Sequence, residues 1–442
     1  MRTKIVTALA FVFFITINAQ DKKWTLQECV NYALENNISV KRSELAIELK
    51  NEEIINRKSG FYPTVTASTS QRLTFGSAQD RVTFRRVNAT SHSTSVGINA
   101  GITIFNGFRI INQVEQSRIG LEASKYDLEK LKDDISLTVV NSYLNVLFNK
   151  ENLKIAKSQI EVSQKQVSQI SRLVEAGVQP KSNLLEVEAN LANDEQKVVI
   201  AQNSLELALL DLAQTLQLDY VGFDVENIIV NTPSELLMYD EALPIYKIAV
   251  ENRSEIKSAK LNVLGASKGI DIAKSAFLPT LSFNYNFGSA ASFLDLESIS
   301  NKAFFYQLDN NKNNSFSLSL NIPIFSGFRN RSNVNSAKIN YEISQFNLED
   351  TKIQLRKVIE RAFMDAKAAL KTYVAAEKNV TSQELSFKNS QESYNLGVMT
   401  SFDFEQVKNR FLNAQSSLIN AKYDFVFRTK VLDFYVGKSL ID

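Results

Sequence analysis

Hydrophobic residues recur at intervals of seven along the uninterrupted, proline-free stretch 108–175. The first run consists of Val114, Leu121, Leu128 and Ile135, and the second of Val139, Val146, Leu153, Ile160, Val167 and Val174. A sustained seven-residue repeat predicts a helix that coils left-handedly around neighbouring helices. The shorter step between the two runs is a stutter, which locally unwinds such a supercoil. At about 1.5 Å per residue, this helix is expected to extend roughly 100 Å.

Two stretches ahead of this helix alternate between apolar and polar residues. The apolar positions are Val65, Ala67, Thr69, Leu73 and Phe75 in the first stretch, and Val96, Ile98, Ala100, Ile102 and Ile104 in the second. A period of two predicts strands with one apolar and one polar face. We interpret the polar residues 76–90 between them as a loop. Strands of about ten residues are long enough to cross a bilayer at a tilt.

Helices are predicted before the strands and after the long helix. Thr25 is a candidate N-cap with Glu28 as its capping-box partner, and this first helix is expected to end near Ser59. Gly177 ends the long helix and Pro180 opens a return helix. The seams of the return helix are Leu184, Leu191, Val198, Leu205 and Leu212, and Val187, Ala201 and Ala208.

The second half of the chain repeats the first. Residues 61–63, Phe-Tyr-Pro, return as Phe-Leu-Pro at 277–279, and 104–109, Ile-Phe-Asn-Gly-Phe-Arg, return as Ile-Phe-Ser-Gly-Phe-Arg at 324–329. The heptad seams and the stutter recur with the same offset. Matching order at matching offsets indicates an internal duplication of one structural unit.

The repeat predicts the organisation of the whole chain. The first part comprises a signal peptide (1–19) and a first repeat (20–240), made of a helix, a strand pair (about 62–105), a long helix (about 108–175), a return helix (about 181–217) and a connector (about 218–240). The second repeat (241–442) comprises a helix (about 243–275), a strand pair (about 280–325), a long helix (about 328–396) and a return helix (about 402–435). In each repeat, the helix ahead of the strands and the return helix are expected to lie end to end beside the long helix. We expect the connector to form a belt around the helices where these two short helices meet.

Composition narrows the class of protein. The chain has 442 residues, 44% of them hydrophobic, and a net charge of +2, which is typical of a folded protein and not of a nucleic-acid binder. Arg2 and Lys4, followed by the apolar run 5–17, predict a secretory signal peptide. With one cysteine, Cys29, and one histidine, His92, the sequence offers no disulfide framework, His-based triad or His-rich metal cluster. We therefore predict neither an enzyme nor a cofactor site.

Four strands cannot form a closed membrane barrel, which needs at least about eight. An open sheet edge in lipid leaves backbone groups without partners. We therefore expect several copies to pool their strands under cyclic symmetry, with their helices continuing as a water-filled α-helical cylinder. The alternative is a soluble sheet covered by another domain.

The chain resembles the outer membrane efflux proteins of the TolC family over nearly its whole mature length. The resemblance is carried by the duplicated layout, by Pro-Ile-Phe-Ser-Gly at 323–327, and by tips that read Glu-Ala-Gly-Val at 175–178 and Tyr-Asn-Leu-Gly-Val at 394–398. It implies a mainly α fold of long coiled-coil hairpins forming an α-barrel, with four strands per chain in a trimeric twelve-stranded β-barrel. It also implies a homotrimer in outer membrane lipid with a periplasmic extension. A periplasmic adaptor and an inner-membrane pump of the RND or ABC type would be its partners.

The resemblance also implies a periplasmic gate at the tips. Its residues map to Tyr394, Asp403, Gln406 and Asn183. Met399 stands where the family has a gate arginine, and Gln406 and Asn183 stand where it has acidic residues, so the sequence departs from the family's acidic ring and salt-bridged latch. Tyr394 also fits a heptad seam, and Asp403 also fits a helix N-terminal carboxylate. Residues expected to contact an adaptor are Gly177, Val178, Gly397 and Val398.

The expected function is a passive outer membrane duct of a tripartite efflux system, opened by the adaptor and pump. A type I protein secretion or metal efflux system uses the same outer component, and the sequence leaves the cargo open between drugs, metals and proteins. The rival from another class is a periplasmic structural coiled coil that conducts nothing.

Overall fold

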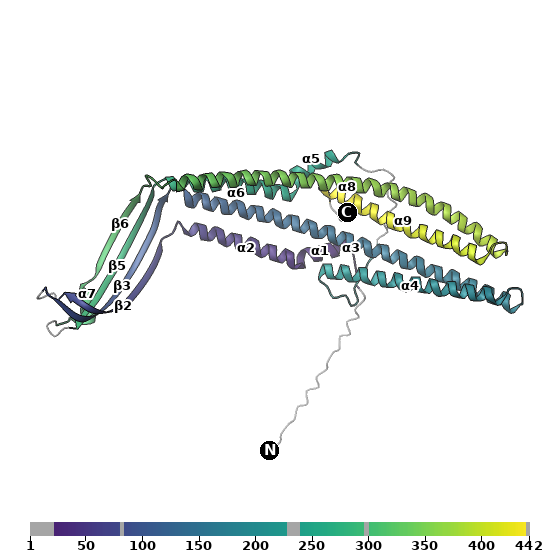
Figure 1. The fold of residues 1–442 in the computed structure, drawn as a ribbon, viewed down its shortest axis with the longest axis horizontal. Coiled ribbons are helices and arrows are strands. Elements are labelled where there is room, and N and C mark those ends of the chain that lie inside the picture. Colours follow the sequence, from purple (N-terminus) through teal and green to yellow (C-terminus); the bar gives the residue numbers. More distant parts are fainter. Residues whose placement is uncertain (1–21, 80–83, 228–238, 296–299, 439–442) are drawn as a thin grey trace, which may run out of the picture. The chain divides into compact units, whose positions relative to one another are not determined.

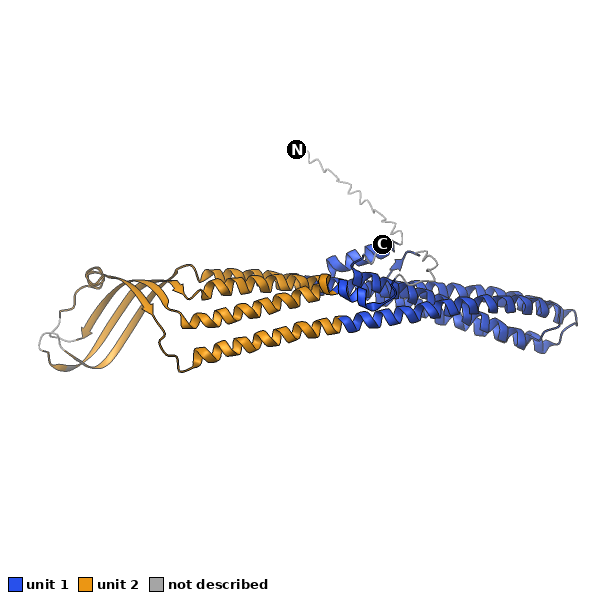
Figure 2. Cartoon of the chain, turned by 90° about the horizontal axis from the view of Figure 1, so that it is seen from above, with its two compact units in different colours: residues 1–41, 131–249, 356–442 blue, residues 42–130, 250–355 orange. Residues whose placement is uncertain are grey.

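A computed structural model describes residues 22–79, 84–227, 239–295 and 300–438. The predicted signal peptide and the central part of the predicted connector, 228–238, lie outside these ranges. The described chain falls into two compact units (Figure 2). Unit 1 takes residues 1–41, 131–249 and 356–442, and unit 2 takes 42–130 and 250–355. Each unit therefore combines segments from both sequence repeats.

In unit 2, four strands form one antiparallel sheet in the order β2–β3–β5–β6 (Figure 1). Their bounds are Thr64–Gln79 for β2, Arg86–Asn106 for β3, Thr280–Asp295 for β5 and Asn313–Asn321 for β6. Ser68 lies opposite Gly97, Gly97 opposite Gly288, and Gly288 opposite Asn313. Within the described residues, β2 and β6 each have one edge without a partner strand.

The strands β2, β3 and β5 are longer than the apolar pattern predicted. The predicted loop 76–90 is wrong, because β2 and β3 pair continuously out to Gln79 and Arg86. Main-chain pairing does not require apolar side chains, so it continues through polar residues that the alternation cannot mark. At the other end, the predicted bound of about 325 for the second strand pair, which includes Ile322 and Ile324, is also wrong. Pro323 has no N–H for the ladder, and β6 ends at Asn321.

Helices adjoin the sheet in unit 2 at sharp turns. The turn Gly107-Phe108 precedes α3 (Arg109–Glu175), and Gly327-Phe328 precedes α8 (Arg329–Asn395). All four turn residues have positive φ, between 60° and 65°. The duplicated Gly-Phe motif therefore specifies the same left-handed turn in both repeats.

The remaining unit 2 helices are α2 (Ile38–Ser59), which begins in unit 1, α6 (Ser254–Lys274), the short 3-10 helix η1 (Ser275–Phe277) and α7 (Phe304–Asn310). Gln116 on α3 donates to the Gly265 carbonyl on α6 at 2.9 Å. Asn330 on α8 donates to the Ala276 carbonyl of η1 at 2.7 Å. The sequence pattern did not predict α7.

Each helix predicted ahead of a strand pair is two helices. Thr25 caps α1 (Leu26–Asn36) with the predicted capping box to Glu28, but Asn37 is extended and α2 begins anew after it. In the second repeat, extended Arg253 separates α5 (Ala242–Asn252) from α6. The two breaks occupy equivalent positions, and neither contains the proline or glycine by which a break is recognised.

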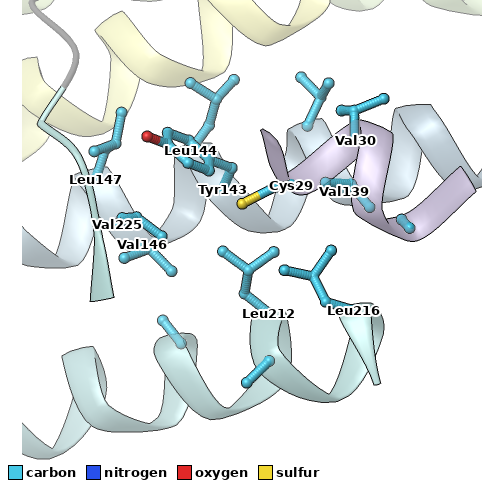
Figure 3. Packing of buried hydrophobic residues seen from close by; sticks show 14 of the residues in the cluster. Cys29, Val30, Val139, Tyr143, Leu144, Val146, Leu147, Leu212, Leu216 and Val225 are labelled. Carbon is cyan, nitrogen blue, oxygen red and sulfur yellow. The ribbon is translucent and has the colours of Figure 1, made fainter. Parts of the chain in front are cut away.

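The core of unit 1 surrounds Cys29, Val139, Tyr143 and Leu212, all fully buried (Figure 3). It joins α1, α3 and α4 (Lys181–Leu216) with the two-stranded parallel pair β1 (Lys23–Trp24) and β4 (Asp224–Val225). The Tyr143 hydroxyl donates to the Glu226 carbonyl at 2.8 Å. Unit 1 also contains most of α5 and all of α9 (Ser401–Val436). No helix within the described ranges combines the length and apolarity needed to cross a bilayer.

Candidate functional site at the helical tips

Two helical hairpins end in unit 1, α3–α4 and α8–α9 (Figure 1). Gly177 and Gly397 have φ values of 73° and 74°. The Val178 N–H donates to the Leu173 carbonyl at 2.9 Å, and the Val398 N–H to the Ser393 carbonyl at 3.0 Å. Both helices thus end in the same glycine-dependent turn that satisfies terminal carbonyls. Val178 and Val398 are 68% and 78% exposed, so each tip presents an apolar side chain to its surroundings.

The two tips meet around a cavity of about 440 Å³. Asn183 and Glu186 line it from α4, and Tyr394, Gly397 and Val398 from the other hairpin. Four residues predicted from the sequence are therefore brought together here. Asp403 and Gln406 are exposed on α9 and are not among the lining residues.

Tyr394 is packed into its own hairpin. Its ring stacks on the fully buried Phe404 with centroids 4.8 Å apart. Phe387 lies 5.7 Å from Phe404 and stacks on Phe411 at 5.2 Å, which makes an aromatic column between α8 and α9. Burial raises the pKa of the Tyr394 phenol, and the nearby carboxylates of Glu186 and Glu405 act in the same direction. These contacts fit the interpretation of Tyr394 as a seam residue.

Asp403 is part of the cap of α9. Its N–H donates to the Thr400 hydroxyl oxygen at 3.1 Å, and that hydroxyl donates to the Asp403 carboxylate at 2.7 Å. This is the arrangement of a helix N-terminal carboxylate. Asn183, its equivalent in the first repeat, instead donates through its side chain to the side-chain oxygen of Gln179.

A buried polar cluster, which sequence reasoning missed, lies along the same hairpins. Lys408 of α9 is completely buried and donates to the Asp194 carboxylate at 3.0 Å, the Ser163 hydroxyl at 3.1 Å and the Glu405 carboxylate at 2.8 Å. Ser163 of α3 donates to Asp194 of α4 at 2.6 Å. Lys197 reaches Asp194 from the surface at 3.0 Å. We call Ser163, Asp194, Lys197, Glu405 and Lys408 the hairpin cluster.

Charge is balanced within the hairpin cluster, with two cations against two carboxylates. Burial alone acts to raise the pKa of Asp194. Hydrogen bonds from Ser163, Lys197 and Lys408 outweigh that effect and hold the pKa below its usual value. Because a buried charge without a partner is costly, the buried side chains of Lys408 and Asp194 depend on each other.

A signal for this cluster does exist in the sequence. The second seam of α4 runs Val187, Asp194, Ala201 at intervals of seven, so a carboxylate occupies a position reserved for apolar side chains. Ser163 stands three residues after the seam residue Ile160. Lys408 follows the buried Val407 and carries no signal of its own in the heptad pattern.

Comparison with known proteins gives a consistent result. The model of a family described as outer membrane efflux protein matches residues 29–216 and 245–438. The chain is 20% identical over 422 residues to the outer membrane efflux protein BepC of Brucella suis biovar 1, covering 95% of this chain and 86% of that protein. It is 23% identical over 344 residues to the outer membrane protein TolC of Escherichia coli K12, covering 77% and 68%. A crystal structure of CusC superposes with a TM-score of 0.77 at 18% identity, covering 94% of this chain and 92% of that one.

Proposed function

The chain belongs to the outer membrane efflux protein family, and from this premise we propose that it forms the outer membrane duct of a tripartite efflux system. The duct is a homotrimer, it is passive, and it performs no catalysis. Residues 1–19 direct the chain across the inner membrane as a signal peptide. A periplasmic adaptor and an inner-membrane pump complete the system and select the cargo.

The observation that carries this proposal is the unfinished sheet. The described strands form a four-stranded sheet in the order β2–β3–β5–β6, and both of its edges are open. Phe316, Leu318 and Leu320 alternate along β6 and are 71%, 66% and 61% exposed. An apolar face suits lipid, but open edges in lipid leave main-chain groups unsatisfied. Three copies of the sheet supply twelve strands and remove every edge.

Exposed apolar positions on the unit 2 helices also favour a second copy. Ile339, Ile343, Phe346 and Ile353 of α8 are 56%, 50%, 73% and 61% exposed in the single chain. Their spacing of four, three and seven residues is that of a helix–helix seam. On α2, Leu45 and Leu49 are 59% and 71% exposed. A ring of copies would cover such faces.

We assign the gate to the hairpin tips. Asn183, Tyr394, Asp403 and Gln406 are its residues, and adaptor contact falls to Gly177, Val178, Gly397 and Val398. The exposed valines at both tips support an apolar docking contact. The hairpin cluster, which joins α3 and α4 to α9, is the internal connection that a relative movement of the hairpins must strain.

Conductance tests the proposal directly. Purified full-length protein reconstituted into a planar bilayer should give discrete, reproducible single-channel steps, and detergent extracts of the outer membrane should contain a stable trimer. A non-conducting periplasmic coiled coil would give neither result, and that outcome would refute the duct.

A further inference from the structure

The edge strand β6 and its neighbour β5 do not end together. β6 pairs with β5 only from Thr280 to Gly288, whereas β5 continues to Asp295 and stays paired with β3 on its other side. Residues 289–295 therefore extend beyond the reach of β6. An exposed strand edge of this kind is a template for pairing with another chain.

Side-chain amides occupy this edge in place of a strand. The Ser292 N–H donates to the Gln307 side-chain oxygen at 2.9 Å, and the Leu294 N–H to the Asn301 side-chain oxygen at 3.1 Å. Asn301 donates in return to the Leu294 carbonyl at 3.0 Å. Asn311 donates to the Ala290 carbonyl at 2.6 Å. Four main-chain groups on alternate residues are thus paired as a neighbouring strand would pair them.

The amides are held in place by the packing of α7. The Ser289 hydroxyl donates to the Leu308 carbonyl at 2.5 Å, and Phe304 stacks on Phe293 with centroids 6.4 Å apart. Ala291 is completely buried. The segment 301–311 is therefore built onto β5. We call it the edge cap.

We propose that the edge cap confines pairing with a second copy of this chain to β6. The inference rests on the proposed ring of copies. The second copy contributes β2, which is 16 residues long, against the 9 residues of β6. β2 begins and β6 ends on the same side of the sheet, where the long helices adjoin. The residues of β2 left without a ladder partner therefore lie at the opposite end, beside the edge cap.

Apolar side chains on both surfaces suit that second contact. On the outer half of β2, Leu73 and Phe75 are 48% and 74% exposed. On the edge cap, Phe305 and Tyr306 are 80% and 54% exposed. The boundary between copies then has two parts, a main-chain ladder of at most nine residues along β6 and a side-chain contact with the edge cap.

Cysteine cross-linking in the outer membrane tests this division. Single cysteines along 66–79 of β2 are combined with Ser317→Cys on β6 or with Ser292→Cys on β5, while the native Cys29 is buried. Oxidation should form a disulfide between β2 and the Ser317→Cys position of another copy. No disulfide should form between β2 and Ser292→Cys. Equal linking at both positions, or linking only at Ser292→Cys, would overturn the edge cap and leave the ring intact. Linking at neither would remove the ring, and this inference with it.

A variant then exposes the edge. In Asn301→Ala/Gln307→Ala/Asn311→Ala, Ser292→Cys should become able to form links between copies or larger oligomers. Asn310→Ala, which removes another exposed amide of the edge cap, is the matched control and should behave like the unaltered chain. No change in the triple variant, with the sheet still formed, would contradict the proposal.

Discussion

At the scale of single residues, the hairpin cluster is the least expected feature of the molecule. Lys408 carries its charge into the interior with no exposed surface, and Asp194 is only 3% exposed. A buried ion pair rarely adds stability compared with well-packed apolar residues, but removing one partner is costly. We therefore expect the pair to act mainly by specifying which helices lie together and the register of α9 against α3 and α4.

Replacing Lys408 with methionine should destabilise unit 1 by about 3–5 kcal/mol, because it leaves the Asp194 carboxylate buried without its main cation. Lys197→Met is the matched control. It removes a cation from the same carboxylate, but Lys197 is 49% exposed, so the expected loss is below about 1 kcal/mol. Denaturant unfolding followed by circular dichroism measures both. Equal effects of the two substitutions would show that burial does not set the strength of the pair.

The proposed gate carboxylate gives a second residue-scale prediction. Three copies of Asp403 near the axis would favour cations, so Asp403→Asn should lower cation selectivity in planar bilayers. Asn retains a side-chain oxygen that can accept from Thr400, so the α9 cap should persist. Gln406→Glu adds a carboxylate at the neighbouring gate position and should change selectivity in the opposite direction. Unchanged reversal potentials in both variants would remove Asp403 from the gate.

Sequence reasoning found individual residues where a local rule applies. The Thr25 capping box depends on residues three positions apart, and both tip turns need glycine at positive φ. The hairpin cluster joins α9 to α3 and α4, with Lys408 lying 245 positions from Ser163 and 214 from Asp194, so no local rule identifies it. Asp194 on an apolar seam was the one available sign.

At the scale of elements, the two Gly-Phe turns between strand and helix share a backbone conformation but differ in the residues packed around them. Gly107 and Gly327 have φ values of 65° and 60°. A Cβ at Gly107 would lie 2.7 Å from both the Leu278 Cβ and the Ser275 carbonyl oxygen, whereas one at Gly327 meets nothing within 4 Å. The two repeats therefore have the same turn, but only the turn at Gly107 is closely packed against neighbouring residues.

Alanine substitution should separate the cost of the left-handed backbone from the cost of the close contact at Gly107. Gly327→Ala should cost about 1–2 kcal/mol from the left-handed backbone alone. Gly107→Ala should cost about 1–3 kcal/mol more, because η1 and the following residues must move away from the added methyl group. Thermal unfolding of the two variants in parallel gives the comparison. A Gly327→Ala loss as large as that of Gly107→Ala would contradict the close approach.

Element boundaries were predictable where a periodic signal or a breaker marks them. The structure has α3 and α8 as helices of 67 residues each, where the heptads run without proline. The breaks at Asn37 and Arg253 escaped prediction because neither residue breaks a helix by itself. The end of β2 from Gly76 and the outer part of β3 escaped because polar residues pair through the main chain as readily as apolar ones, and α7 because seven residues are too few to show a helical repeat.

At the scale of the whole molecule, a single chain leaves its sheet open and several apolar faces uncovered. The described sheet has four strands with two open edges. Apolar side chains on β6, on α2 and on the part of α8 that lies in unit 2 are exposed in a single copy. Such surfaces are stable in a membrane protein only when other copies or lipid cover them. The internal duplication gives each chain two strand pairs and two hairpins, which in the proposed trimer make one third of a closed barrel.

The mass of the full-length protein extracted from outer membranes in mild detergent tests this claim most directly. Native mass spectrometry, which separates bound detergent from protein, should give three copies of the 49.7 kDa chain, less the cleaved signal peptide. A species of one copy that keeps its sheet folded in the detergent would contradict the account, because the open edges would then need no partner chain.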